Sequence, residues 1–230
     1  MGKKPTGSVS YPTSAKGLNY RAVLTELTKT GLILQSDPVL PNIAGIIAGE
    51  RIAGSWWGHS RGHEIYGVLK GLDANPDALV TRLVSGKVTY IHRALWSDFL
   101  AVATSTEPWQ TKDLPAGSGR LLSLVRRRGK VRMDRVSQKG EDAQLNEAAR
   151  NIESRLLVYS EEFHTETGAH TKVLTAWSHC PKLQGFHRHR TTSGDARRTI
   201  DAIVSGLNSK YRGTAKLPWW PTHTITPKPV

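Results

Sequence analysis

The chain is poor in cysteine, in acidic residues and in long apolar runs, and each shortage excludes a class of protein. Cys180 is the only cysteine in 230 residues, which excludes an internal disulfide and a thiolate metal cluster. No apolar run approaches the roughly 18 residues of a membrane-spanning helix. The start of the chain has no hydrophobic signal core. We therefore expect a cytoplasmic protein that does not enter a membrane.

Motifs for common cofactors and nucleophiles are also missing. The sequence has no phosphate-binding P-loop, no dinucleotide glycine fingerprint and no nucleophile elbow. His59, His63 and Glu64 follow the order H-x-x-x-H-E, whereas zinc hydrolase motifs place the glutamate between the histidines. Residues 187–190 (HRHR) have no second ligand cluster to complete a zinc site. The sequence therefore predicts neither a cofactor nor a metal.

The shortage of acidic residues leaves a strongly basic chain. Lysine and arginine number 32 against 19 aspartate and glutamate, which gives a net charge of +13. Such a charge favours a polyanionic partner through counterion release and electrostatic steering. Residues 120–139 hold eight basic residues and a single acid, Asp134. The basic residues are Arg120, Arg126, Arg127, Arg128, Lys130, Arg132, Arg135 and Lys139.

Residues 146–177 are the stretch around which the rest is organised. Apolar residues in and beside its first part recur at helical spacing, which predicts a helix with one buried face. These are Leu145, Ala148, Ala149, Ile152 and Leu156. An extended run follows, then the turn cluster at 165–168 (TETG) and a returning strand over 169–177. A polar-faced helix that leads directly into a hairpin is typical of a winged-helix domain.

The pattern extends upstream of this stretch. Residues 120–128 predict a helix ended by Gly129, with a second short helix over 133–139, so a winged-helix unit spans 120–178. The order helix, helix, helix, hairpin recurs over residues 18–105, with its third helix beginning at His59 or Ser60.

We therefore predict a mainly α protein with small β-hairpins (α+β), built from two winged-helix-like units in tandem. Residues 1–17 are expected to be a disordered basic arm, and 106–119 a linker rich in proline and glycine. Residues 179–230 would form a basic loop, a helix over 196–207 capped by Ser193 or Asp195, and a tail whose Trp219 and Trp220 dock onto the body.

The segment from Leu121 to Trp177 resembles the winged-helix DNA-binding superfamily. The tandem arrangement and basic surface are also similar to bacterial winged-helix DNA glycosylases, which excise alkylated or crosslinked bases. That family's catalytic signature is Gln-apolar-Gln or Gln-apolar-Asp. The nearest match here, Gln144-Leu145-Asn146, departs from it in the last residue, and no catalytic residue is carried over.

The resemblance implies binding of double-stranded DNA through the second unit. The expected base-reading residues lie on the helix, and the expected backbone contacts lie in the basic strip and the wing. The helix residues are Asn146, Arg150, Asn151, Ser154 and Arg155. The strip and wing residues are Arg126, Arg127, Arg128, Lys130, Arg132, Thr165, His170 and Lys172.

Two other functions also fit the sequence. The run GSWWGHSRGHE at 54–64 places Trp56, Trp57, His59, His63 and Glu64 close together. These residues fit either a packed core or a base-excising repair site, in which tryptophans stack on an extruded base and Glu64, His63 or His59 transfers protons. The charge equally permits a protein that binds structured RNA, and the oligomeric state is left open.

Overall fold

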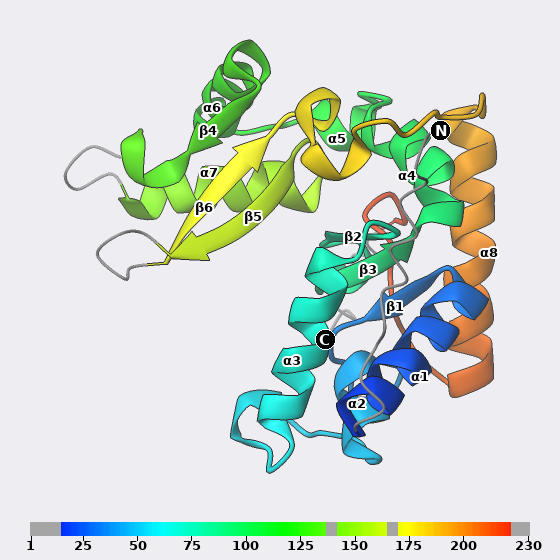
Figure 1. The fold of residues 1–230 in the computed structure, drawn as a ribbon. Helices are drawn as coiled ribbons and strands as arrows, with labels where there is room; N and C mark the ends of the chain where they lie inside the picture. Colours follow the sequence, from blue (N-terminus) through cyan, green and yellow to red (C-terminus); the bar gives the residue numbers. More distant parts are fainter. Residues whose placement is uncertain (1–14, 137–141, 165–169, 222–230) are drawn as a thin grey trace, which may run out of the picture.

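The computed structural model describes residues 15–136, 142–164 and 170–221. Within them the protein is mainly helical and contains two small antiparallel sheets of three strands each (Figure 1). None of the helices in these ranges is long and apolar enough to cross a membrane.

The first group of elements covers the first half of the chain. Its sheet has the strand order β1-β3-β2, with both pairs antiparallel. The elements are α1 (Ala15–Thr30), β1 (Leu32–Leu34), α2 (Ile43–Ala48), α3 (Gly62–Ala74), β2 (Ala78–Thr81) and β3 (Thr89–His92).

Two helices, α4 (Trp96–Ala103) and α5 (Pro108–Thr111), lead to the second group. Its sheet has the order β4-β6-β5, so the third strand in sequence again lies in the middle. A long helix, α8 (Ser193–Tyr211), follows the second group and packs against α4. The elements of the group are α6 (Ala116–Arg128), β4 (Lys130–Arg132), α7 (Asp142–Ser154), β5 (Tyr159–His164) and β6 (His170–Thr175).

A glycine joins the first helix to the first strand in each group. Gly31 lies between α1 and β1 with φ 78°, and Gly129 lies between α6 and β4 with φ 72°. Positive φ is open to glycine at little steric cost, which explains why the helix can end and a strand begin within one residue. The sequence prediction of a helix end at Gly129 is confirmed.

The first sheet is covered on both faces. Ile33 and Tyr90 point into a core shared with α1, α2 and α3. Leu34 and Ile91 point the other way, into a core shared with α4 and α8. Side chains alternate between the faces of a strand, so a sheet with apolar residues on both must be covered twice. Strand β1 is accordingly buried throughout, β3 over its first three residues and β2 over its first two.

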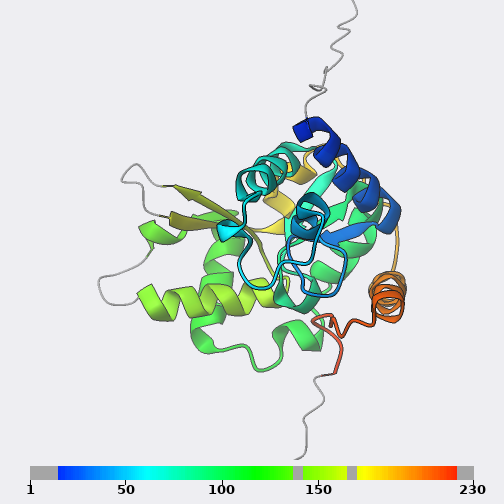
Figure 2. The ribbon, with the colours of Figure 1, turned by 90° about the horizontal axis from the view of Figure 1, so that it is seen from below.

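The two groups share one of these cores. Leu156, Tyr159, Trp177 and Cys180, all from the second half, belong to the cluster formed by α4, α8 and the first sheet. A separate core lies between α6, α7 and the second sheet. The second group lies to the left of the first in Figure 1. In Figure 2, α7 and the β5–β6 ribbon also lie to the left of the first group.

The tail after α8 closes over the first half. The indole N–H groups of Trp219 and Trp220 both donate to Oδ1 of Asp201, at 2.8 and 2.6 Å. The backbone N–H of Ser85, in the turn between β2 and β3, donates to the carbonyl oxygen of Lys216 at 2.7 Å. The predicted docking of the two tryptophans is confirmed, and the tail also covers the turn of the first hairpin.

Several predicted boundaries differ from the structure. The short helix expected over 133–139 is a single 3-10 turn at Met133–Arg135, and residues 137–139 lie outside the described residues. The third helix begins at Gly62, because residues 56–58 form their own 3-10 turn. Helix α8 is capped by Thr192, whose hydroxyl accepts from the N–H of Asp195.

The predicted arm and linker also contain helical residues in the structure. Residues 15–17 of the expected arm belong to α1, and residues 1–14 lie outside the described residues. The linker over 106–119 contains α5 and the first turn of α6. Glu107 and Gln110 form a capping box at α5, which explains how helix forms beside Pro108.

Candidate nucleic-acid interface

Helix α7 has one buried face and one exposed face, as its apolar spacing predicted. Ala148, Ala149 and Ile152 are buried against α6 and the second sheet. Asn146 and Arg150 are exposed, and Asn151 is half-buried. Asn146 and Arg150 are four positions apart, so they lie on the same side of the helix. An amide and a guanidinium are therefore presented together to solvent.

A cluster of cations lies at the end of α6. Arg126, Arg127, Arg128 and Lys130 are all exposed, and no described residue forms an ion pair with them. Positive charge at a helix C-terminus is favoured by the helix dipole, which supplies a local reason for this placement. The side chains remain available to an anionic partner.

Other predicted contact residues have partners inside the protein. Arg155 donates to the carbonyl oxygens of Gln110 at 3.1 Å and Lys112 at 2.7 Å, and so fastens α7 to the α5 segment. Nζ of Lys172 lies 2.9 and 3.0 Å from the two carboxylate oxygens of buried Glu153. Arg155 therefore joins α7 to the segment before the second unit, and Lys172 joins β6 to α7 within it.

Two further members of the predicted set have local partners. Arg132 forms two hydrogen bonds with the carboxylate of Asp134, at 3.2 and 2.7 Å, and this hydrogen bonding lowers the pKa of Asp134. The hydroxyl of Ser154 donates to the carbonyl oxygen of Asn151 at 3.1 Å. Ser154 remains exposed, whereas Arg132 is half-buried.

The second hairpin pairs as predicted over its described part. Strands β5 and β6 are antiparallel from Tyr159 opposite Thr175 to His164 opposite His170. Thr165 and the rest of the expected wing tip, up to residue 169, lie outside the described residues, and only the backbone pairing of His170 is described. The first hairpin differs, because its turn is bonded to the tail at Ser85.

The predicted acid–base residues of the run at 54–64 have separate partners. Nε2 of His59 lies 3.0 Å from a carboxylate oxygen of Glu50, and His63 is exposed on α3. Glu64 accepts two hydrogen bonds from Arg61, at 3.2 and 2.7 Å. Glu64 also lines a groove between α1 and α3 of about 600 Å³, and Trp56 and the two histidines are not among that groove's lining residues. The proposed acid–base residues therefore do not converge there.

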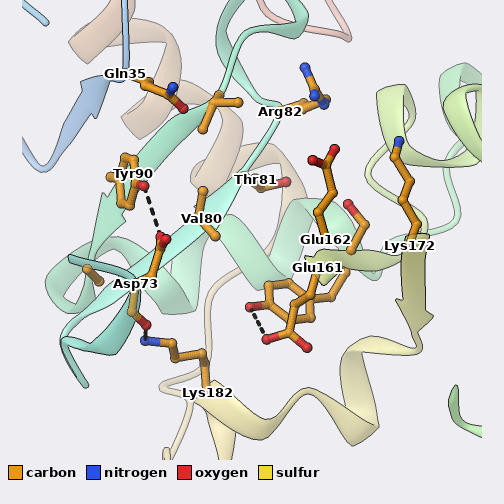
Figure 3. Close-up of a pocket in the computed structure, with 14 residues that line it drawn as sticks. Gln35, Asp73, Val80, Thr81, Arg82, Tyr90, Glu161, Glu162, Lys172 and Lys182 are labelled. Carbon is orange, nitrogen blue, oxygen red and sulfur yellow. Dashed lines mark hydrogen bonds between the residues drawn. The ribbon is translucent and has the colours of Figure 1, made fainter. Parts of the chain in front are cut away.

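A second cavity lies between the two sheets and was not predicted. It has a volume of about 290 Å³ and is lined from both halves of the chain (Figure 3). The hydroxyl of Tyr90 donates to Oδ1 of Asp73 at 2.9 Å, and the hydroxyl of Tyr159 donates to Glu161 at 3.1 Å. Lys182 donates to the backbone carbonyl oxygen of Asp73, close to the end of α3.

Desolvation dominates the electrostatics of this cavity. Asp73 is partly exposed to solvent, but it also lines the cavity, and desolvation there raises the pKa of its carboxyl group. Burial likewise lowers the pKa of Lys182 and raises the pKa values of both tyrosines. It raises the pKa of the nearby Cys180 thiol to about 11, which keeps the thiol protonated and unreactive at neutral pH.

Sequence reasoning missed this cavity because its residues come from separate segments. Asp73 lies in the last turn of α3, Tyr90 lies in β3 and Lys182 follows the second sheet. No local spacing links them. Among residues 15–136, 142–164 and 170–221, no group of three or more histidine, cysteine, aspartate or glutamate side chains is arranged to hold a metal ion.

Comparisons with protein families, with curated proteins and with solved structures give no match to this chain.

Proposed function

We propose that this chain is a tandem winged-helix protein that binds duplex DNA through its second unit. Two observations carry the proposal: the exposed polar face of α7, and the exposed cation cluster at the end of α6, the helix that packs against α7. The shared order of elements, with strand orders β1-β3-β2 and β4-β6-β5, supports a winged-helix build for both units.

The chemistry of α7 suits the major groove. The helix has 13 residues, which corresponds to a length of about 20 Å, and the groove is about 12 Å wide. Asparagine pairs well with adenine and arginine with guanine on their major-groove edges. Asn146 and Arg150 would therefore read bases, while Arg126, Arg127 and Arg128 would contact phosphates.

The first unit is a poorer candidate for the same role. Its hairpin turn is hydrogen-bonded to the tail at Lys216, and both faces of its sheet are covered. A wing in that position has no free tip to lay along a DNA backbone. We therefore assign duplex binding to the second unit and a supporting role to the first.

Salt dependence tests this assignment. The triple variant Arg126→Gln, Arg127→Gln, Arg128→Gln should reduce the slope of log affinity against log salt by about 3, since each lost phosphate contact removes about 0.9. The matched control replaces Arg21, Lys29 and Lys210, three exposed cations on α1 and α8, by glutamine. Equal slopes for the two triple variants would mean that net charge alone drives binding.

The same assay separates the alternatives. Arg150→Ala should weaken binding to preferred sites by about 1–3 kcal/mol and flatten the preference between duplexes. Tighter binding to structured RNA than to duplex DNA would favour the RNA-binding alternative. Release of a base, abolished by Glu64→Gln or His63→Ala, would favour a repair enzyme instead.

A further inference from the structure

Trp57 is an exposed tryptophan in a chain that otherwise packs its indoles. It is 65% exposed, and Tyr66 beside it is 46% exposed. Trp56 is 5% exposed and belongs to the core of the first unit, while Trp96, Trp109, Trp177, Trp219 and Trp220 belong to or pack on the shared core. Large aromatic side chains are usually buried, so an exposed pair of them points to a surface that contacts a partner.

The exposed ring is held firmly in place. The Trp57 ring stacks on Trp56 with centroids 4.2 Å apart and an interplanar angle of 23°. Tyr66 of α3 lies 5.6 Å away at an angle of 40°. The hydroxyl of Ser55 accepts from the backbone N–H of Trp57, and His59 anchors the end of the turn to Glu50. The ring of Trp57 is therefore packed on one side against the buried ring of Trp56.

The indole N–H of Trp57 also lacks an acceptor within the described part of the chain, unlike those of five other tryptophans. Trp96 and Trp177 donate to backbone carbonyl oxygens, and Trp109, Trp219 and Trp220 donate to carboxylates. Trp57 thus offers both a flat apolar ring and a free donor to solvent.

Two exposed cations accompany these rings in the sequence. Lys70 lies four residues after Tyr66 and therefore on the same side of α3, and Arg51 lies six residues before Trp57. Neither forms an ion pair with a described residue. The neighbouring acids are engaged, since Glu50 pairs with His59 and Glu64 with Arg61. The ligand that suits this combination is flat, aromatic and anionic.

We propose that Trp57 and Tyr66 form a stacking platform for the unpaired bases of single-stranded nucleic acid. Bases stack on aromatic rings without sequence preference, and Arg51 and Lys70 would contact the phosphates. This inference shares with the proposed function only the expectation of a nucleic-acid ligand. The platform itself lies on the first unit, away from the residues proposed to bind duplex DNA.

Tryptophan fluorescence gives a direct test. Titration with a short oligodeoxyadenylate should quench the tryptophan emission of the 230-residue chain. Trp57→Ala should weaken binding roughly 5- to 150-fold, as expected for loss of one base–aromatic stack. Trp57→Phe should retain part of the affinity and lose most of the quench. An abasic oligonucleotide of equal length keeps the phosphates without the bases, and it should bind weakly and leave the emission unchanged.

Two controls make the outcome decisive. Trp220→Phe removes an indole that is docked on Asp201, and the quench should persist. The triple arginine variant of α6 should lose duplex binding but keep the single-strand quench, which separates failure of the platform from failure of the proposed function. Unchanged affinity in Trp57→Ala with an unchanged melting temperature would overturn the platform. Loss of self-association in that variant, without any effect on oligonucleotide binding, would assign the rings to a protein contact instead.

Discussion

At the scale of single residues, Gly129 shows how little freedom the junction between α6 and β4 has. Its φ is 72°, and an added Cβ would come within 2.8 Å of the His179 ring. We expect Gly129→Ala to lower the free energy of unfolding by about 2 kcal/mol or more, because positive φ alone costs about 1–2 kcal/mol for a residue with a Cβ. Denaturant unfolding measures the loss.

Gly185 is the matched control for Gly129. It has the same φ of 72°, but nothing lies within 4 Å of an added Cβ. Gly185→Ala should therefore show the conformational cost alone. If the two alanine variants were equally stable, contact with His179 would contribute nothing.

The carboxyl group of Asp73 should make stability depend on pH. Desolvation raises its pKa in the folded state, so the folded protein binds more protons than the unfolded chain above the ordinary carboxyl pKa of about 4. Stability contributed by this residue is therefore lost as pH rises through that window. Asp73→Asn removes the titration and leaves an oxygen to accept from Tyr90.

We expect the stability of Asp73→Asn, relative to the unaltered protein, to increase between about pH 4 and neutral pH. The measurement is denaturant unfolding of both proteins across this range. A difference that stays constant with pH would show that the Asp73 carboxyl is solvated as in the unfolded chain.

At the scale of elements, α7 is fastened to β6 by the ion pair between Glu153 and Lys172. The Glu153 side chain is 4% exposed and the Lys172 side chain 23%. Lys172→Met should cost about 3 kcal/mol, because it leaves a buried carboxylate without its partner. The double variant with Glu153→Gln should recover part of that loss, which a double-mutant cycle measures. A cost near zero would instead leave Lys172 free for the phosphate contact that the sequence suggested.

Elements with strong periodicity could be predicted, and short ones could not. The apolar spacing of α7 and α8 gave their buried faces, which the structure confirms at Ile152, Ile200 and Val204. Strands β1 and β4 have three residues each and become strands only by pairing with β3 and β6, far along the chain. Three residues hold no usable alternation, so the sequence shows two hairpins where the structure has two three-stranded sheets.

Some features of the candidate site could likewise be predicted from the sequence, and others could not. The exposed faces of α6 and α7 follow from local spacing, so the availability of Arg126 and Arg150 could be predicted. The engagement of Arg155 by carbonyl oxygens near Lys112 could not, because it depends on where the α5 segment folds back. The cavity around Asp73 and Lys182 depends on contacts across more than a hundred positions and has no local signature.

At the scale of the whole molecule, Asp201 holds the tail to α8. It accepts from two indoles at once, and hydrogen bonds to a charged group contribute about 1.5–3 kcal/mol each. We expect Asp201→Ala to lower the free energy of unfolding by about 3 kcal/mol and to make the segment around Lys216 more sensitive to proteases. Asp201→Asn keeps a neutral acceptor and should lose less. Equal stability of Asp201→Ala and the unaltered protein would mean that apolar packing alone retains the tail.

The apolar cluster to which both halves contribute has a consequence for dissection of the protein. A cut within residues 106–119 would separate α4 from Leu156, Tyr159 and Trp177. Each fragment would then expose the apolar side chains that pack against the other half in the intact protein. Such fragments would aggregate when made singly and would regain solubility when made together. We therefore expect the two halves to unfold together as one cooperative unit and not to fold as separate domains.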